Sequence, residues 1–283
     1  LEPLVAGEVF PSFGMTEPAV ASSDPTQLQT SAELEGDEWV INGRKWFTSG
    51  AGNAAYTTAM VRTEFDAPDH SAFSMLVVPT DTAGYNIIRD VKVMGQADGH
   101  YEVVYDNVRV PKENLLGPRG QGFKIAQDRL GPGRIFHCMR WLGQAQRAFD
   151  LMCDRANNRV AFGKNLGEHQ QIQKFIFDTA AEIQASRLLT LHAAQKIDQG
   201  DEARIEIGLI KVFGAKMLHN SIDRAIQVHG ALGVTEDTPL ERMYRHARYA
   251  RIYDGADEVH VMNTARRILR VYNEGAKFDF GLR

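Results

Sequence analysis

The chain has 283 residues, of which 43% are hydrophobic and 24% charged, and its formal net charge is −4 at pH 7. This composition is that of a globular protein with enough apolar side chains for a substantial core, and the length allows one large domain or two smaller ones. A mild negative charge gives no electrostatic reason to expect nucleic acid or an anionic membrane as the main partner. No apolar stretch is long enough for a membrane span, and no signal-peptide pattern is present.

The first 117 residues have the pattern of a β domain. Turn residues recur about every ten positions between short runs rich in Val, Ile and aromatic residues, as in a sandwich or barrel. Trp39–Ile41 follows a Gly-Asp turn and precedes Asn42-Gly43, which predicts a hairpin. Residues 73–79 form a strand that ends at a proline, and residues 102–111 are predicted to be a strand pair around Asp106-Asn107.

From residue 118 onwards the pattern is helical. Gly117–Gly122 is a glycine-rich loop, and beyond Gly133 apolar residues recur at helical spacing. The spacing predicts helices through residues 135–152, 172–188, 207–218, 239–248 and 257–271. Strands followed by helices indicate an α+β protein with segregated units. We expect an antiparallel β-barrel or sandwich over residues 1–117 and an up-and-down helical bundle over residues 118–283.

Cys138 and Cys153 are the only cysteines, and both fall in what is predicted to be one long helix that includes residues 135–152. Their separation along a helix is about 22 Å, which is too far for a disulfide. Reduced thiols favour an intracellular location, the cytoplasm of a bacterium or the mitochondrial matrix of a eukaryote. The chain begins at Leu1 rather than Met, inside a fold-like segment, so we expect a missing upstream part.

Generic catalytic motifs are missing from the sequence. It has no His-Glu-x-x-His, Cys-x-x-Cys or Gly-x-Ser-x-Gly, and no metal site is predicted. The glycine-rich run Gly117–Lys124 lacks the Ser or Thr of a phosphate loop, so we interpret it as a plain loop. No Gly-x-Gly-x-x-Gly joins a strand to a helix, which argues against a nicotinamide cofactor.

Three longer segments resemble signatures of the acyl-CoA dehydrogenase family. Residues 13–18 (Phe-Gly-Met-Thr-Glu-Pro), followed by Ser22-Ser23-Asp24, resemble its flavin loop, and residues 41–49 resemble its second flavin strand. Residues 252–258 resemble the segment that supplies its catalytic base. Residues 110–117 and 159–164 also fit, in the expected order. The resemblance covers the whole chain and implies the family's middle β domain and C-terminal helical bundle, without its N-terminal helical domain.

Two runs resemble one branch of that family in particular. They are Gly133–Arg140, with the pattern Gly-Arg-Ile-x-His-Cys-Met-Arg, and Asp254–His260. The large eukaryotic members of this branch are fused to a phosphotransferase-like domain. Nothing of such a domain is present in this chain.

The resemblance implies FAD as the cofactor. The Met15 backbone and the Thr16 hydroxyl would contact the pyrimidine side of the flavin. Ungapped alignment places Phe47 against the flavin and Ser49 near N5, whereas a one-residue shift would place Trp46 and Thr48 there. The helical domain would complete the FAD site of a neighbouring subunit in a homotetramer, through Arg159 at the pyrophosphate and through Phe162, Gln170, Gln227, Gly230 and Ala231. Ala256 and Glu258 are further implied FAD contacts.

The same resemblance implies an acyl-CoA substrate. One extra residue before Asp24 leaves open whether Ser22 or Ser23 would meet the CoA pyrophosphate. Arg134 matches an arginine near the CoA, and Tyr253 and Gly255 flank the base position.

Asp254 stands where most family members have the glutamate that acts as the base. The second location known in the family corresponds here to Gly133, which cannot act. The competing interpretation is that Asp254 is the N-cap of the last helix. Aspartate is one methylene shorter, so its carboxylate would lie about 1.5 Å further back.

The implied reaction is FAD-dependent α,β-dehydrogenation of an acyl-CoA to the trans-2-enoyl-CoA, as in fatty acid β-oxidation, with electron-transferring flavoprotein as the electron acceptor. A nitroalkane-oxidase-like enzyme and a non-catalytic or DNA-associated flavoprotein remain as alternatives. Nucleic acid is not expected, because arginines at every third position rotate about 60° per step around a helix instead of lining one face. These are Arg242, Arg245, Arg248 and Arg251.

Overall fold

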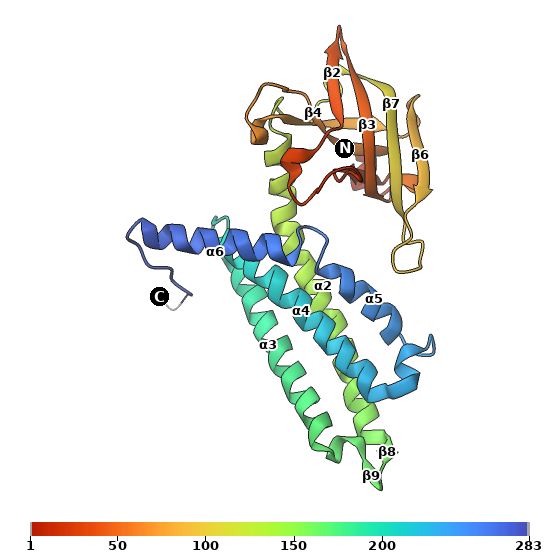
Figure 1. The fold of residues 1–283 in the computed structure, drawn as a ribbon, viewed down its shortest axis with the longest axis vertical. Coiled ribbons are helices and arrows are strands. Elements are labelled where there is room, and N and C mark those ends of the chain that lie inside the picture. The colour runs from red at the N-terminus through yellow and green to blue at the C-terminus, as the bar shows by residue number, and fades with distance from the viewer. Residues whose placement is uncertain (1, 282–283) are drawn as a thin grey trace. The chain divides into compact units, whose positions relative to one another are not determined.

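A computed structural model describes residues 2–281 of the chain (Figure 1). The chain divides after Arg129 into two compact units. The predicted boundary after residue 117 lies in the loop before helix α2 (Gly122–Asn158). The division comes later because the first turns of α2 belong to the first unit, where Phe123 and Ala126 pack in an apolar cluster with Phe73.

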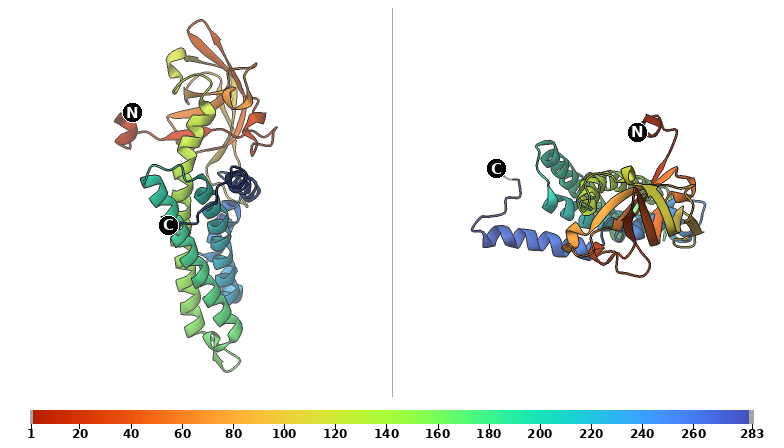
Figure 2. Two further views of the ribbon diagram at one scale, coloured as in Figure 1. Left: turned by 90° about the vertical axis from the view of Figure 1, so that its left-hand side faces the viewer. Right: turned by 90° about the horizontal axis from the view of Figure 1, so that it is seen from above.

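The first unit is a mostly antiparallel, curled sheet (Figure 2). Its order is β1-β4-β2-β3-β7-β6, with β5 paired to β4. Among the described residues β1 pairs with β4 in parallel, and a single parallel bridge joins β2 to β4. The sheet is preceded by a short helix, α1 (Glu2–Val5). The strands are β1 (Pro11–Gly14), β2 (Ser31–Glu35), β3 (Glu38–Ser49), β4 (Tyr56–Arg62), β5 (Phe73–Pro79), β6 (Tyr85–Asp90) and β7 (His100–Pro111).

Two predicted turns in this sheet are wrong. The chain does not reverse at Asn42-Gly43 or at Asp106-Asn107, because β3 and β7 each continue through those residues. The register of the β3–β7 pair shifts between Ile41 and Gly43. Asn107 adopts φ +49°, and its backbone N–H donates to Asn42 Oδ1 at 2.8 Å. Both turn-like dipeptides therefore form one irregularity of the ladder, in which a side chain replaces a backbone acceptor.

The second unit is a helical bundle, as expected. The long helices α2, α3 and α4 run alongside one another, and α6 runs across α4 (Figures 1 and 2). Four of the five predicted helices lie within observed ones, and the one predicted over residues 239–248 begins one residue before α5. Helix α2 begins earlier than expected and passes through Pro132. A small hairpin separates α2 from α3. The elements after α2 are β8 (Val160–Ala161), β9 (Lys164–Asn165), α3 (Gln170–Asp198), α4 (Arg204–His229), α5 (Leu240–Ala250) and α6 (Asp257–Asn273).

The bundle core fixes the loop that joins α5 to α6. Trp141, Ile210 and Ala250 belong to one buried apolar cluster. Helices α4 and α6 approach closely at Gly208, where an added Cβ would lie 2.0 Å from Thr264 Oγ1. Residues 251–256 are thus held between two packed helices. Among the described residues, no helix is both long and apolar enough to cross a lipid bilayer.

Candidate active site

Asp254 lies in the loop between α5 and α6 with a strained backbone. Its φ is +51°, and Gly255 follows with φ +100°. A non-glycine residue in this region is uncommon, although aspartate tolerates it better than most residues do. The N-cap of α6 is Ala256, and no side chain caps that helix. The interpretation of Asp254 as the N-cap of α6 is therefore wrong. Helix capping does not account for an aspartate at this position.

Two long side chains hold the Asp254 carbonyl. Arg134 Nε donates to Asp254 O at 3.0 Å, and His260 Nε2 lies 3.1 Å from the same oxygen. Burial lowers the pKa of His260 to about 4, so its ring is neutral near pH 7 and Nε2–H is the donor. Burial also lowers the pKa of Arg134, although the Asp254 charge opposes this. A Cβ on Gly255 would lie 2.6 Å from His260 Nε2, so glycine is required there by space as well as by φ.

Lys211 of α4 fastens both ends of the same loop from inside the bundle. Its ammonium donates to Ala250 O at 2.8 Å and to Gly255 O at 3.1 Å. It also faces the rings of Trp141 and Tyr253 at 5.5 and 5.6 Å. The side chain is completely buried, and burial lowers the pKa of Lys211 to about 8, while the charges of nearby carboxylates oppose this.

A histidine contacts the Asp254 carboxylate, and two aromatic side chains, Trp141 and Tyr253, pack against that histidine. His137 Nε2 lies 2.6 Å from Asp254 Oδ2, and the two side chains are 20% and 28% exposed. Trp141 Nε1 donates to Tyr253 Oη at 2.8 Å. Burial raises the pKa of Tyr253 to about 12, so this residue is a neutral phenol. Arg134, Tyr253, Asp254 and Gly255, which the sequence singled out, therefore come together in one place.

The predicted flavin loop of the first unit is tied to strand β3. Thr16 Oγ1 donates to Trp46 O at 2.6 Å, and the Trp46 N–H donates to Thr16 O at 3.0 Å. Buried Lys45 donates to Met15 O at 2.9 Å and to Glu17 Oε1 at 2.8 Å. Burial lowers the pKa of Lys45 to about 8, and Glu17 opposes this change. Met15 and Thr16 thus have fixed positions beside the strand.

Burial distinguishes the two proposed pairs on β3. The register of the β3–β7 pair shifts between Lys45 and Thr48, and Phe47 adopts φ +50°. Thr48 is completely buried, and its hydroxyl has no partner among the described residues. Phe47 is 40% exposed, and Ser49 is exposed with its hydroxyl 2.7 Å from His100 Nδ1. Phe47 and Ser49 therefore share the outer face, whereas Thr48 points inward.

The two candidate serines also differ. The Ser22 hydroxyl accepts from the Glu17 N–H at 2.9 Å and donates to Glu17 O at 3.2 Å, so it closes the turn after the flavin loop. Ser23 is exposed, and the structure shows no side-chain hydrogen bond for it within residues 2–281.

The remaining predicted cofactor residues of the bundle lie on exposed surface. The β8–β9 hairpin and the C-terminal end of α4 lie at the same end of the bundle (Figure 1). Phe162 and Gly163 form the hairpin turn, both with positive φ, and the Phe162 side chain is 97% exposed. Exposed residues near this end are Arg159, Gln170, Gln227, Gly230 and Ala231. Ala256 and Glu258 lie instead at the start of α6, beside Asp254.

Sequence reasoning missed His137, Lys211 and His260 as site residues. Lys211 had a visible signal, because it follows Ile207 by one helical turn on the apolar stripe of α4. His137 and His260 stand in the two runs that resemble one branch of the family, but those runs do not pair His137 with Asp254, which is distant in the sequence and is brought to it only by the tertiary fold.

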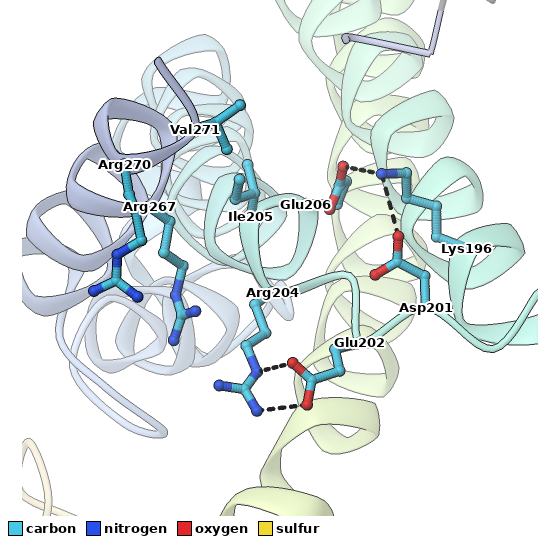
Figure 3. A pocket seen from close by; sticks show the side chains of 9 residues that line it. All are labelled: Lys196, Asp201, Glu202, Arg204, Ile205, Glu206, Arg267, Arg270 and Val271. Carbon is cyan, nitrogen blue, oxygen red and sulfur yellow. Dashed lines mark hydrogen bonds and ion pairs between the residues drawn. The ribbon is translucent and has the colours of Figure 1, made fainter. Parts of the chain in front are cut away.

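A cavity of about 270 Å³ lies elsewhere on the bundle (Figure 3). Charged side chains from α3, α4 and α6 line it, but its acids are largely paired. Lys196 lies 2.7 Å from Glu206, and Arg204 pairs with Glu202. No residue of the Asp254 loop lines this cavity, so it is separate from the candidate active site.

Two family models define the class of the protein. The model "Acyl-CoA dehydrogenase, middle domain" matches residues 12–108, and "Acyl-CoA dehydrogenase, C-terminal domain" matches residues 120–269. The chain belongs to the acyl-CoA dehydrogenase family, whose members are flavin-dependent oxidoreductases. The predicted family membership is thus confirmed.

Individual relatives agree with this assignment. The protein named "Probable acyl-CoA dehydrogenase FadE2" of Mycobacterium tuberculosis is 51% identical over 272 residues, which cover 94% of this chain and 67% of the relative. "Acyl-CoA dehydrogenase family member 11" of Rattus norvegicus is 46% identical over 95% of this chain, but only 36% of its own length is covered. The chain thus spans about two-thirds of one relative and about a third of the other. The predicted branch with large eukaryotic members is confirmed.

Solved structures have the same fold. An acyl-CoA dehydrogenase homologue from Mycobacterium abscessus superposes with a TM-score of 0.93 at 42% identity, covering 96% of this chain and 69% of the other. Butyryl-CoA dehydrogenase from Megasphaera elsdenii gives a TM-score of 0.88 at 31% identity, covering 95% and 70%.

The buried ammonium of Lys211 predicts a specific pH dependence of stability. An unfolded lysine keeps its proton up to about pH 10.4. Because the pKa of Lys211 is about 8 in the folded chain, the unfolded chain binds more protons between pH 8 and 10.5, and stability rises with pH there. The pKa difference corresponds to about 3 kcal/mol. We expect the difference in unfolding free energy between the wild type and Lys211→Met to increase by up to about 3 kcal/mol as the pH rises from 8 to 10.5.

Urea denaturation followed by circular dichroism at pH 7.5, 9 and 10.5 checks this prediction. Lys216→Met, an exposed lysine on the same helix, is the matched control and should give a constant difference. Parallel stability curves for the wild type and Lys211→Met would contradict the prediction.

Proposed function

We propose that this chain carries out the FAD-dependent α,β-dehydrogenation of an acyl-CoA thioester to the trans-2-enoyl-CoA, with Asp254 as the base. The observation that carries the proposal is the Asp254 turn. Its backbone is strained, its carbonyl is held by Arg134 and His260, and its carboxylate caps no helix. Strain of this kind persists where the surroundings impose it, and it clusters at functional sites.

The proposed role of Asp254 is to remove the α-proton of the thioester. A C–H beside a thioester carbonyl is a weak acid, so the carbonyl oxygen must be polarised as the proton leaves. We assign this to the backbone N–H of Asp254, since removing one donor of an oxyanion hole typically costs about 3–4 kcal/mol. Removal of water from the site by the bound substrate would make the carboxylate a stronger base.

The first unit offers a surface that fits a flavin ring. Phe47 presents an exposed aromatic side chain, and the exposed Ser49 hydroxyl lies two residues on, on the same face of β3. The anchored Met15 and Thr16 are proposed for the pyrimidine side. FAD, when bound, would accept the β-hydride at N5. The exposure of Phe47 and Ser49, against the burial of Thr48, supports the pair Phe47 and Ser49 over Trp46 and Thr48.

The exposed end of the bundle supports a contribution to a neighbouring subunit. Arg159 is exposed, and Phe162 exposes 97% of its side chain in the turn of the β8–β9 hairpin, so both side chains are accessible to a partner. We propose that this end meets the FAD of another subunit in a homotetramer, through Arg159, Phe162, Gln170, Gln227, Gly230 and Ala231. Ala256 and Glu258 are proposed as further FAD contacts.

The substrate handle is proposed to be coenzyme A. Ser22 is occupied within its own turn, which supports Ser23 as the contact for the CoA pyrophosphate. Arg134 donates to the carbonyl of the proposed base, and we propose that it also lies near the CoA. Electron-transferring flavoprotein is proposed as the electron acceptor. Two outcomes would favour the alternatives: flavin reduction by nitroalkanes and reoxidation by oxygen, or no reduction by any member of an acyl-CoA panel.

Asp254→Asn tests the proposed base. The variant keeps nearly the same volume and should retain FAD and acyl-CoA binding, but it cannot accept the α-proton. Flavin reduction in a single turnover should fall by about 10²–10⁴-fold, the range for loss of a general base. Asp254→Glu should keep partial activity. Unchanged bleaching of the flavin in Asp254→Asn would remove Asp254 from the mechanism.

Ser49→Ala and Thr48→Val distinguish the two strand alignments. Ser49→Ala should slow flavin reduction by about 3–10-fold, the loss expected from one hydrogen bond. Thr48→Val removes an inward-facing hydroxyl and should change only stability. Stopped-flow absorbance with one acyl-CoA measures both variants. The reverse result, with a slow Thr48→Val and a normal Ser49→Ala, would favour the shifted alignment.

Arg159→Glu tests the contribution to a neighbouring subunit. We expect the variant to lose most of its FAD while its circular dichroism spectrum and thermal midpoint stay those of the wild type, because the side chain is exposed. Arg147→Glu, an exposed arginine on α2, is the control and should keep its flavin. Full FAD affinity in Arg159→Glu, or in monomers obtained by dilution, would contradict the cross-subunit assignment.

A further inference from the structure

His137 contacts the carboxylate of Asp254 directly. It projects from α2, and its Nε2 lies 2.6 Å from Asp254 Oδ2. Its ring stacks on Trp141 with centroids 5.9 Å apart and an interplanar angle of 20°, and it tilts against Tyr253 at 4.7 Å. The ring is therefore held in one orientation from two sides.

A second residue determines which ring nitrogen carries the proton. Arg140, one turn further along α2, directs its guanidinium at His137 Nδ1. Arginine has only donors, so Nδ1 must be the acceptor. The proton of a neutral imidazole then lies on Nε2, and this N–H donates to the Asp254 carboxylate.

We propose that His137, fixed as the neutral Nε2–H tautomer by Arg140, is a positioning residue that orients the Asp254 carboxylate and sets the pH range in which it acts as a base. The inference rests on the proposed function, in which Asp254 removes the α-proton. A donor to the ionised form of a carboxylate stabilises that form and keeps it ready to accept a proton. A neutral imidazole does this without a full positive charge, so less of the basicity is lost than with an ion pair.

The contact between Arg140 and His137 also determines which residue keeps the abstracted proton. Protonation of His137 would need a hydrogen on Nδ1, where the Arg140 guanidinium already donates. The proton therefore remains on Asp254 rather than passing to the imidazole. Arg140 acts on the reaction only through His137.

Other charged groups act on Asp254 as well, and any pH profile includes them. They come from three helices and from the loop itself. The titratable and charged groups facing the loop are Arg134, His137 and Arg140 of α2, Lys211 of α4, Tyr253 beside Asp254, and Asp257 and His260 of α6.

The test uses the flavin-loaded full-length protein with the variants His137→Phe, His137→Gln and Arg140→Met. Phenylalanine keeps the ring packing but removes both nitrogens. Single-turnover flavin reduction by an acyl-CoA should fall by about 10–100-fold, the typical cost of removing an orienting partner, and its pH midpoint should rise by about one unit. Glutamine can still donate near the Nε2 position and should restore much of the rate and the midpoint. His192→Phe, the same change on α3, is the control.

Two further measurements separate positioning from packing. Arg140→Met should slow the reaction in the wild-type background but should have no added effect in His137→Phe, because it acts through that ring. In protein labelled with ¹⁵N-histidine, the His137 signals at pH 7.5, identified by their loss in His137→Phe, should show the neutral Nε2–H tautomer. A Nδ1–H tautomer or an imidazolium would overturn the proposal.

Asp254→Asn, measured in parallel, separates a failure of the positioning role of His137 from a failure of the base assignment of Asp254. If Asp254→Asn is inactive while His137→Phe has the wild-type rate and pH midpoint, the positioning role is overturned and the proposed function stands. If Asp254→Asn reduces its flavin normally, the base assignment fails and the role of His137 fails with it. Loss in both variants, with recovery in His137→Gln, supports both.

Discussion

The turn at Asp254 and Gly255 is the constraint on which the candidate active site depends. Two successive residues with positive φ cannot continue a helix or a strand, and the non-glycine one costs about 1–3 kcal/mol. The turn persists because long side chains from different helices bond to its carbonyl groups. Arg134 and His260 hold Asp254 O, and Lys211 holds Gly255 O. The shape of the loop is therefore imposed by the bundle and not by local preference.

In the first unit, too, a buried side chain bonds to a loop carbonyl. Lys45 is buried in the sheet and bonds to Met15 O, as Lys211 bonds to Gly255 O in the bundle. Burial lowers the pKa of each lysine to about 8, which shows that both charges are costly where they are. Glu17 compensates Lys45 directly and also accepts backbone N–H groups at 2.7 and 2.9 Å, which ties the flavin loop to the segment before β2. In each unit a buried lysine fixes the loop proposed for chemistry.

The sequence predicts much of the fold, for identifiable reasons. The helices are recognised because apolar residues such as Ile210 and Leu218 recur at helical spacing and are buried in one cluster. The predicted turn at Asn42-Gly43 is wrong because the same residue types serve irregular ladders, where an asparagine side chain replaces a backbone group. The early start of α2 was missed because Gly131-Pro132-Gly133 resembles a break, yet the helix continues through it.

The candidate site was likewise predicted from the sequence only in part. Asp254 and its neighbours were found through a contiguous motif, which a single sequence displays directly. The contact of His137 with Asp254 and the bonds of Lys211 to the same loop come from helices α2 and α4, far away along the chain, and only the tertiary fold reveals them. Arg134 was singled out, but its bond to Asp254 O was not. Spacing alone cannot pair His137 with Asp254. The burial of Lys211 was foreseeable from its place on an apolar stripe, but its carbonyl partners were not.

The backbone of the turn also bears on why the acid is aspartate. Aspartate is among the few non-glycine residues that adopt the left-handed region with any frequency, and glutamate is not. A shorter side chain has fewer rotamers to lose, so the hydrogen bond with His137 orients it at a lower entropic cost. The strained φ, the short acid and the imidazole thus form one arrangement. A glutamate at position 254 would change the backbone strain, the orientation and the position of the carboxylate together. The pH profile of Asp254→Glu reports on the orientation and position of its carboxylate, whereas its stability reports on the backbone strain, so the two measurements together separate these effects.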